Sequence, residues 1–566
     1  MPASSNRGTP NAVRILAVFL VLVLANTALA DNSKISPDLQ PLLANPSNTV
    51  NVIVQYNSPP QTCTAGGLLG LVCGVVNLLS GVVHIVFSLI NAVAGTMQAG
   101  DVITLSNQSN VSYISLDRSL LATLDYSAAG VDAPAAWNSG WDGTGVGVAV
   151  IDSGIYSHPD LAGAFGQSRV VYRKSFVGGS QFDDFGHGTH VAGIVAGNGK
   201  SSNIPGSAHI LRGIAPNASL LDLRVLNQNG ASNDSVVIAA IEAAVKLKSK
   251  YNVRVINLSL GRPIYESCNK DPLCQAVEAA WNNGIVVVVA AGNLGRNGYA
   301  TVLSPGNSPH AITVGAMKTL ETMTKSDDLI ASYSSKGPTY IDLTVKPDVV
   351  APGNMVVSLL APGSTLANTY SANVVAPSYY SKKGTGPAQY LRLSGTSMAT
   401  PVVSGSVALM LQKDPTLTPD TVKARLMKTA RKTFPVSSTA TDPSTGQSYT
   451  SYYDAFTIGA GYVDVASTLA DYEQTNGSSV SPGSRYDPVS QQGYFVLPLS
   501  SIWRLSPPWS TSMVWGSTVL SSGGTAIWNA SDVWAQNVSW GTNVSWGTNV
   551  SWGTNVSWGT SAQGEK

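Results

Sequence analysis

Charged residues are scarce in this sequence: Asp, Glu, Lys and Arg make up 11% of its 566 residues, against about 25% in an average soluble chain. The 33 basic and 32 acidic residues nearly cancel, leaving a net charge of +1. This balance excludes the basic surface of a nucleic-acid-binding protein and a highly charged disordered tail. Only six histidines occur, none in the HExxH spacing of a common class of zinc hydrolases. Four cysteines are too few for a disulfide scaffold.

Length and apolar content are what the chain does have. Hydrophobic residues make up 44% of the sequence, so a sizeable core can be buried. At about 150 residues per domain, the length allows roughly three or four domains. The character of the sequence changes several times along the chain, and these changes give the predicted domain boundaries.

Residues 1–30 are typical of a secretory signal peptide. Arg7 and Arg14 precede an apolar run at residues 15–25, and a small-residue cleavage signal follows at residues 28–30. An uncleaved membrane anchor is the alternative, but the run is short against the roughly 20 apolar residues that cross a bilayer. We therefore expect cleavage after this signal and a secreted protein.

The four cysteines are expected to pair, because an extracellular environment permits disulfide bonds. Four cysteines allow three pairings. Proximity in the sequence favours Cys63 with Cys73 and Cys268 with Cys274. Both pairs are expected to hold short loops together. Free thiols are the alternative, which is less expected outside the cytosol.

Residues 31–120 predict a small α+β domain. Residues 39–100 contain no Asp, Glu, Lys or Arg, and the stretch 66–95 within them is largely apolar. Strands are predicted at residues 52–54 and 111–116, with buried helix faces between them. The alternative is a membrane-seeking segment, but the polar residues that interrupt the apolar stretch are unfavourable in lipid.

Residues 121–471 alternate between strand-like and helix-like patterns. Continuous apolar runs, as expected of buried parallel strands, occur at residues 146–151, 220–226, 253–258 and 285–291. Asn233 precedes an apolar helical stripe, and a further helix is predicted to begin at Asp271 and end at Gly284. This alternation predicts a doubly wound, mostly parallel α/β sheet with its site at the carboxyl ends of the strands.

Beyond this region the composition changes twice. Residues 472–510 are rich in Ser, Pro, Gly and Asn and are predicted to be a linker. Residues 511–566 form a Trp-rich tail with four copies of Asn-Val-Ser-Trp-Gly-Thr at 537–560. Because the repeat has an even period, every Val and Trp would face one side of an extended strand. A repetitive β element and a disordered low-complexity tail both agree with this pattern.

Three short segments carry the residue types of nucleophilic catalysis. Asp152 ends a buried apolar strand, His187 begins the sequence His-Gly-Thr-His-Val-Ala-Gly, and Ser397 lies in Gly-Thr-Ser-Met-Ala-Thr-Pro at the start of another helix. Each segment alone has a structural explanation, as a cap, a core histidine or a chance Gly-x-Ser. Together, in the order Asp, His, Ser, they supply the three roles of a charge-stabilised serine nucleophile.

These segments resemble the three signature motifs of the subtilisin-like serine proteases, or subtilases, in the order found in subtilisin. The resemblance spans residues 131–469 and is strongest to the secreted bacterial alkaline-protease branch. Supporting stretches lie in between, at residues 212–216, 259–261, 290–293, 334–338, 346–353 and 459–463. The resemblance implies a secreted serine endopeptidase that acts on polypeptides and needs no cofactor for its chemistry.

The resemblance also implies roles for individual residues. Ser397 would attack the peptide carbonyl, His187 would take its proton and deliver it to the leaving amine, and Asp152 would hold the imidazole. Asn293 would stabilise the oxyanion together with the Ser397 N–H. His190, one helical turn from His187, is expected to be a packing residue and not a second base.

Substrate-binding residues are implied on two walls of the pocket for the P1 side chain, namely Ser259, Leu260 and Gly261 on one wall and Ala291 and Gly292 on the other. The first wall is expected to be an edge strand that pairs with the substrate backbone. Leu303 falls near the pocket floor, where several subtilases have glycine. This difference predicts a shallower pocket.

Residues 197–210 differ from the calcium-binding loop of the simplest subtilisins. Calcium takes six to eight oxygen ligands, and no such set can be assembled from this loop. No metal-ligating residue is therefore predicted, and a structural calcium elsewhere is left open.

The resemblance gives residues 31–120 the place of a pro-domain, which acts as a chaperone and inhibitor of the same chain and is removed by self-cleavage. Residues 117–120 are expected to lead into the active site. The alternative, from a different functional class, is a surface-attached binding protein that keeps the subtilase domain as a scaffold and attaches through the Trp-rich tail. Both combine if the tail tethers an active protease.

Overall fold

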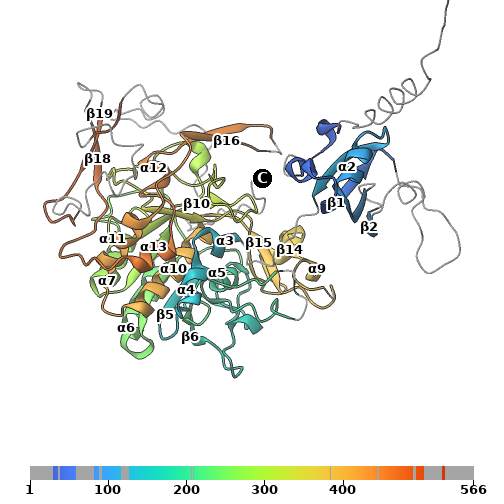
Figure 1. The fold of residues 1–566 in the computed structure, drawn as a ribbon. Coiled ribbons are helices and arrows are strands. Elements are labelled where there is room, and N and C mark those ends of the chain that lie inside the picture. The colour runs from blue at the N-terminus through green and yellow to red at the C-terminus, as the bar shows by residue number, and fades with distance from the viewer. Residues whose placement is uncertain are drawn as a thin grey trace, which may run out of the picture. The chain divides into compact units, whose positions relative to one another are not determined.

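The computed structural model describes residues 30–35, 39–58, 82–87, 92–116, 126–204, 207, 209–382, 384–442, 445–487, 492–502 and 526–529. They belong to two compact units, Met1–Leu121 and Ala122–Lys566, whose elements are labelled in Figure 1. Residues 1–29 of the predicted signal peptide, the cysteines Cys63 and Cys73, and the hexapeptide repeats lie outside the described residues. Within the described ranges, no helix combines the length and apolar character needed to cross a membrane.

The first unit is built on a four-stranded antiparallel sheet in the order β2-β3-β1-β4. Its elements are β1 (Thr49–Tyr56), β2 (Val82–Phe87), β3 (Ala92–Gln98), α2 (Ala99–Ser106) and β4 (Val111–Leu116), with 3-10 turns at Asn32–Lys34 and Gln40–Ala44. Val50, Val52 and Val54 alternate along β1 and are buried. They share one core with Val102 and Leu105 of α2.

The secondary structure predicted for this unit is partly right. The strands predicted at residues 52–54 and 111–116 lie in β1 and β4. The apolar stretch 66–95 was expected to supply helix faces, but its described part forms β2 and the start of β3. The physical reason is the β-branched residues Val82, Val83, Ile85 and Val86, which favour strands.

The second unit contains a mixed, mostly parallel sheet, which confirms the predicted α/β class. The strand order is β11-β10-β9-β8-β5-β7-β6, with β12 also paired to β10. All neighbours in this sheet run parallel except β10 and β11. The strands are β5 (Gly147–Asp152), β6 (Val170–Ser175), β7 (Ser219–Arg224), β8 (Val253–Leu258), β9 (Val286–Ala290), β10 (Ile312–Lys318), β11 (Leu329–Ile330) and β12 (Val349–Pro352).

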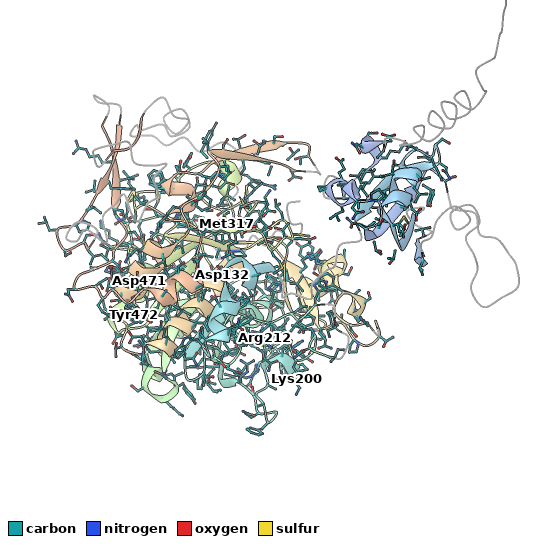
Figure 2. The ribbon with its side chains drawn as sticks, in the orientation of Figure 1. Asp132, Lys200, Arg212, Met317, Asp471 and Tyr472 are labelled. Carbon is teal, nitrogen blue, oxygen red and sulfur yellow. The ribbon has the colours of Figure 1, made fainter. Side chains whose placement is uncertain are left out.

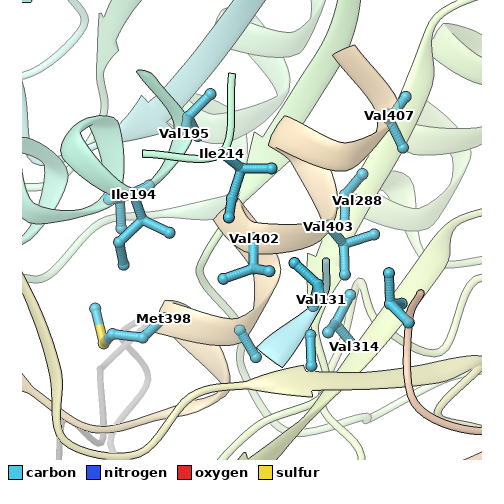
Figure 3. Packing of buried hydrophobic residues seen from close by; sticks show 14 of the residues in the cluster. Val131, Ile194, Val195, Ile214, Val288, Val314, Met398, Val402, Val403 and Val407 are labelled. Carbon is cyan, nitrogen blue, oxygen red and sulfur yellow. The ribbon is translucent and has the colours of Figure 1, made fainter. Parts of the chain in front are cut away.

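Helices cover both faces of this sheet. Strand β5 shows this, because its alternate apolar side chains lie in two different cores, one on each face. Val148 and Val150 belong to the core under α5 (His187–Ala196) and α10 (Thr396–Lys413). Ala149 and Ile151 belong to the core under α6 (Asp234–Tyr251) and α7 (Pro272–Asn282). Figure 3 shows part of the first core, where Val402, Val403 and Val407 of α10 lie among valines and isoleucines of the neighbouring elements.

The predicted helix starts agree with the structure in position. Asp271 is the N-cap of α7, and its carboxylate accepts a hydrogen bond from the Leu273 N–H at 2.9 Å. Asn233 occupies the N-cap of α6, but its side chain makes no capping bond. Gly284 follows the end of α7 with a φ of +74°, a conformation that favours glycine.

The remaining elements of the second unit are short. Three small antiparallel sheets are formed by β13 (Val356–Leu359), β14 (Val374–Val375) and β15 (Tyr390–Leu393), by β16 (Ser437–Thr441) and β17 (Ser448–Tyr452), and by β18 (Gly483–Asp487), β19 (Gln492–Val496) and β20 (Ala526–Asn529). Helices of the same unit are α3 (Tyr126–Gly130), α4 (Ala133–Asn138), α8 (Thr365–Thr369), α9 (Pro377–Tyr380), α11 (Pro419–Thr429), α12 (Ala455–Ile458) and α13 (Val465–Ala470). The 3-10 turns lie at Pro159–Leu161, Gly295–Asn297 and Ser371–Asn373.

The structure disagrees with the linker predicted at residues 472–510. The segment begins at Tyr472, which is labelled together with its neighbour Asp471 in Figure 2. Its described residues pack onto the rest of the second unit. The Ser479 N–H donates to Asp420 at 2.6 Å, and Phe495 and Ile502 are buried in the main core. A polar segment therefore adheres through hydrogen bonds and two apolar side chains, which its composition alone does not reveal.

The structure also contradicts the predicted disulfide between Cys268 and Cys274, since both are buried free thiols. The Cys274 thiol donates to Asn307 Oδ1 at 3.1 Å, and the Cys268 thiol donates to Glu278 Oε1 at 3.6 Å. A hydrogen bond with Cys274 is the largest cause that raises the pKa of Cys268, followed by burial. Each thiol has an oxygen acceptor, and hydrogen bonds hold this turn without a covalent link.

Candidate active site

Asp152 and His187 come from two neighbouring elements. Asp152 is the last residue of β5, and His187 is the first residue of α5. Both are completely buried, and His187 Nδ1 lies 2.8 Å from Asp152 Oδ1. This approach requires glycine at position 188, because an added Cβ there would lie 2.3 Å from the Gly154 carbonyl oxygen. The glycine of the His-Gly-Thr-His sequence thus allows the two side chains to meet.

Ser397 is the second residue of α10 and is 1% exposed. Its hydroxyl donates to the Ser259 carbonyl at 3.3 Å, and the Ser259 hydroxyl donates to the Ser397 carbonyl at 2.8 Å. Ser259 directly follows β8, the parallel neighbour of β5 that carries Asp152. Because α5 and α10 also pack together, the helix starts and strand ends meet where the strand order reverses, as expected of a doubly wound sheet.

Asn293 lies in the loop after β9, and α10 sets the orientation of its amide. The Thr396 hydroxyl accepts a hydrogen bond from the Gly292 N–H at 3.1 Å and donates to Asn293 Oδ1, also at 3.1 Å. The Thr396 N–H donates to the same oxygen at 2.9 Å. Two donors face Oδ1, so Nδ2 points elsewhere. An added Cβ at Gly395 would lie 3.3 Å from Nδ2, which locates this nitrogen beside the start of α10.

Residues 143–481 match the model of the subtilase family, which covers more than half of the chain. The chain belongs to the subtilase family. It is accordingly a serine endopeptidase with polypeptide substrates. The matched range includes all three segments predicted from the sequence.

Individual relatives of this subtilase agree with the family match. The chain is 40% identical over 330 residues to serine protease AprX of Bacillus subtilis (strain 168), covering 57% of this chain and 70% of that protein. It is 36% identical over 349 residues to subtilisin E of the same strain, covering 61% and 76%. An alkaline protease of Alkalihalobacillus alcalophilus is 33% identical over 349 residues, covering 61% and 75%.

Both predicted walls of the P1 pocket have a glycine that lies close to Leu303. An added Cβ at Gly261 would lie 2.9 Å from Leu303 Cβ, and one at Gly292 would lie 2.8 Å from Leu303 Cγ. Ser259, Leu260 and Gly261 continue from β8 but are not part of a strand; the next residue, Arg262, pairs with Ser304 in an antiparallel bridge. These three residues thus lead from β8 directly into a bridged position, and their pairing with a substrate backbone stays a prediction.

A cavity of about 220 Å³ adjoins Leu303. Its lining is mostly apolar and includes Ile264, Val302 and Tyr340. Leu303 thus lines this apolar space and also lies close to both glycines. Among the residues that the structure describes around this cavity there is no Asp or Glu, so they offer no carboxylate to a basic P1 side chain.

His190 has a structural role in this subtilase. It is completely buried, and its Nε2 lies 3.1 Å from the Val356 carbonyl and 3.0 Å from the Leu391 carbonyl. Burial, followed by the neighbouring His187, lowers the pKa of His190 to about 3. A neutral imidazole that donates to two backbone oxygens of β13 and β15 joins α5 to that sheet, in agreement with its predicted packing role.

The sequence patterns do not single out Asp183, which lies four residues before His187 and is 4% exposed. Its carboxylate accepts hydrogen bonds from Ser153, directly after β5, and from Gly186 and Thr189 at the start of α5. Burial raises the pKa of Asp183, against hydrogen bonds from Thr189, Gly186 and Ser153 that lower it. An acidic residue just before the His-Gly-Thr-His sequence is the only signal that could have indicated it.

The loop at residues 197–210 is the one whose sequence differs from the calcium-binding loop of the simplest subtilisins. Within the described ranges, no group of three or more His, Cys, Asp or Glu side chains could hold a metal ion. Asp160 lies next to this loop, but its carboxylate accepts hydrogen bonds from the Ser201 N–H at 2.6 Å and the Tyr390 hydroxyl at 2.7 Å. Calcium elsewhere in the chain stays an open expectation.

Proposed function

We propose that this endopeptidase cleaves peptide bonds through Asp152, His187 and Ser397, with an acyl-enzyme intermediate on Ser397. The observation that carries the proposal is the buried 2.8 Å contact between His187 Nδ1 and Asp152 Oδ1. A carboxylate only accepts, so the contact holds the hydrogen on Nδ1 and leaves Nε2 as the basic nitrogen. Nε2 then takes the Ser397 proton during attack and gives it to the leaving amine.

In this proposal, Asn293 Nδ2 and the Ser397 N–H stabilise the oxyanion that forms during attack. The donors are prepared before the reaction, because Thr396 already orients the Asn293 amide. Ser397 lies at the N-terminus of the 18-residue helix α10. The positive end of the α10 dipole therefore also favours the negative charge of the oxyanion.

The direct test is labelling with a fluorophosphonate, which reacts with activated serines. We expect one label per chain, located on Ser397 by peptide mass spectrometry, and no label in the Ser397→Ala variant. If the protein attaches to the cell surface but no serine is labelled, the result would instead support the alternative, a surface-attached binding protein that uses the subtilase domain as a scaffold. A label on another serine would contradict the assigned nucleophile.

We further propose that the enzyme is secreted and made as a zymogen. Residues 1–30 would be the signal peptide, 31–120 the pro-domain that inhibits the enzyme, and 121–471 the peptidase domain. The compact fold of the first unit around its own core supports a separate pro-domain. N-terminal sequencing of the secreted protein tests the cleavage points.

The Trp-rich tail, residues 511–566, is proposed to attach the enzyme to the cell surface.

Replacing Asn293 with alanine is expected to lower kcat by about 10² to 10³, the loss seen when a donor is removed from such an oxyanion site. KM should change little, because the interaction strengthens only in the transition state. Steady-state kinetics on a peptide substrate measure both constants. Asn283→Ala, which removes an exposed amide bonded to the Ala279 carbonyl, is the matched control. Equal kcat values for the two variants would remove Asn293 from the mechanism.

Replacing Leu303 with glycine is expected to shift cleavage toward large aromatic P1 residues. The change empties the space between Gly261 and Gly292 and joins it to the apolar cavity. Differences of a few methylenes in such pockets change kcat/KM by roughly 10- to 200-fold. The measurement is the ratio of kcat/KM for phenylalanine and alanine at P1. Leu303→Met, which conserves volume, should keep the wild-type ratio, and an unchanged ratio in the glycine variant would refute the shallow pocket.

A further inference from the structure

Asp183 collects four hydrogen bonds in the interior beside the catalytic pair. Oδ1 accepts from the Ser153 hydroxyl and from the Gly186 N–H, both at 2.7 Å. Oδ2 accepts from the Thr189 N–H at 2.8 Å and the Thr189 hydroxyl at 2.6 Å. All four partners donate, so both oxygens act as acceptors, the pattern of an ionised carboxylate.

The partners of Asp183 flank Asp152 and His187 along the chain. Ser153 follows Asp152, and its hydroxyl also accepts from the Gly188 N–H at 2.8 Å. Gly186 precedes His187, and the Thr189 hydroxyl accepts from the Tyr156 N–H at 2.8 Å. One carboxylate and two hydroxyls thus tie the chain after β5 to the first turn of α5 on both sides of His187.

We propose that Asp183 is a positioning residue that keeps His187 at the correct distance and angle from Asp152. The inference rests on the proposed roles of those two residues. Asp183 also satisfies an N–H group at the start of α5, where the N-cap Gly186 has no side chain to do so. A capping role alone would affect the stability of the fold, whereas positioning affects the turnover of each folded active site.

The test is Asp183→Asn. The amide keeps the size of the side chain but has one accepting oxygen, and its NH2 group would face two donors. The first turn of α5 should shift, and a small misplacement of a catalytic group costs up to about 10² in rate. We expect kcat to fall by roughly this factor with KM unchanged, when activity is divided by active sites counted with a fluorophosphonate.

Two controls separate positioning from folding. Asp348→Asn changes another buried acid, which accepts from Lys346 Nζ at 2.7 Å and the Thr313 N–H at 2.8 Å; it should lower stability without changing kcat per active site. Thr189→Val should lower kcat, whereas Thr189→Ser keeps the hydroxyl and should preserve it. The Thr189 pair decides the matter if Asp183→Asn does not fold.

Wild-type kcat per active site in Asp183→Asn, or equal values in Thr189→Val and Thr189→Ser, would overturn the proposal. A fall in kcat per active site in Asp348→Asn as large as that in Asp183→Asn would also overturn the proposal, because the loss would then follow from changing any buried acid. Failure of the wild-type enzyme to label at Ser397 is a different result. It would refute the proposed catalytic roles of Asp152, His187 and Ser397, on which the role of Asp183 rests.

Discussion

Replacing Ser397 with alanine is expected to lower the rate of peptide hydrolysis by about 10⁶, the loss found in subtilisin when the nucleophilic serine is removed. The change deletes one hydroxyl, which donates to the Ser259 carbonyl at 3.3 Å, so the fold should survive. The hydrolysis of an unfolded protein substrate, followed per mole of folded enzyme, measures the effect.

The same variant tests the zymogen. A protein that cleaves its own pro-domain should accumulate as a longer precursor once Ser397 is lost. Ser406→Ala is the matched control, because Ser406 is buried in the same helix and its hydroxyl donates to the Val402 carbonyl of that helix at 2.8 Å. Processing that is equal in the Ser397 and Ser406 variants would mean that another protease removes the pro-domain.

Replacing Asp152 with asparagine is expected to lower kcat by about 10⁴. The amide is nearly the same size as the carboxylate, but it can present an N–H to His187 Nδ1. The hydrogen would then move to Nε2, and the imidazole could no longer accept the Ser397 proton. Pre-steady-state measurement of acylation with an ester substrate isolates this step.

The control for this change is Asp464→Asn at the start of α13, where the carboxylate caps the Ser467 N–H at 2.8 Å. It makes the same chemical change outside the site and should leave acylation unaltered. If Asp152→Asn acylates at the wild-type rate, the 2.8 Å contact with His187 has no part in the reaction, and the proposed mechanism loses its main support.

The catalytic segments could be predicted because each is a short stretch with a local cause. Asp152 ends a run of apolar residues that must form a buried strand. His187 and Ser397 begin helices of small residues that can approach a neighbouring backbone closely. The order of these segments and their resemblance to one family then indicated where they would meet.

Other features depend on contacts between residues far apart in the chain. Residues 472–502 look like a linker by composition, yet Ser479 binds Asp420 and Phe495 reaches the main core. Cys268 and Cys274 are close in the sequence, but each thiol has an oxygen acceptor instead of a disulfide. Neither the packing of this segment nor the free state of the two thiols can be recognised from the local sequence.

The α/β class and the three proposed catalytic side chains could be predicted from the sequence alone, because periodicity and short motifs are local properties. Only the tertiary structure showed that Leu303 lies against both Gly261 and Gly292 and that Asp183 joins the residue after β5 to the start of α5. Both depend on separations of about 3 Å between distant segments. Such separations arise only when a whole sheet and its helices have packed.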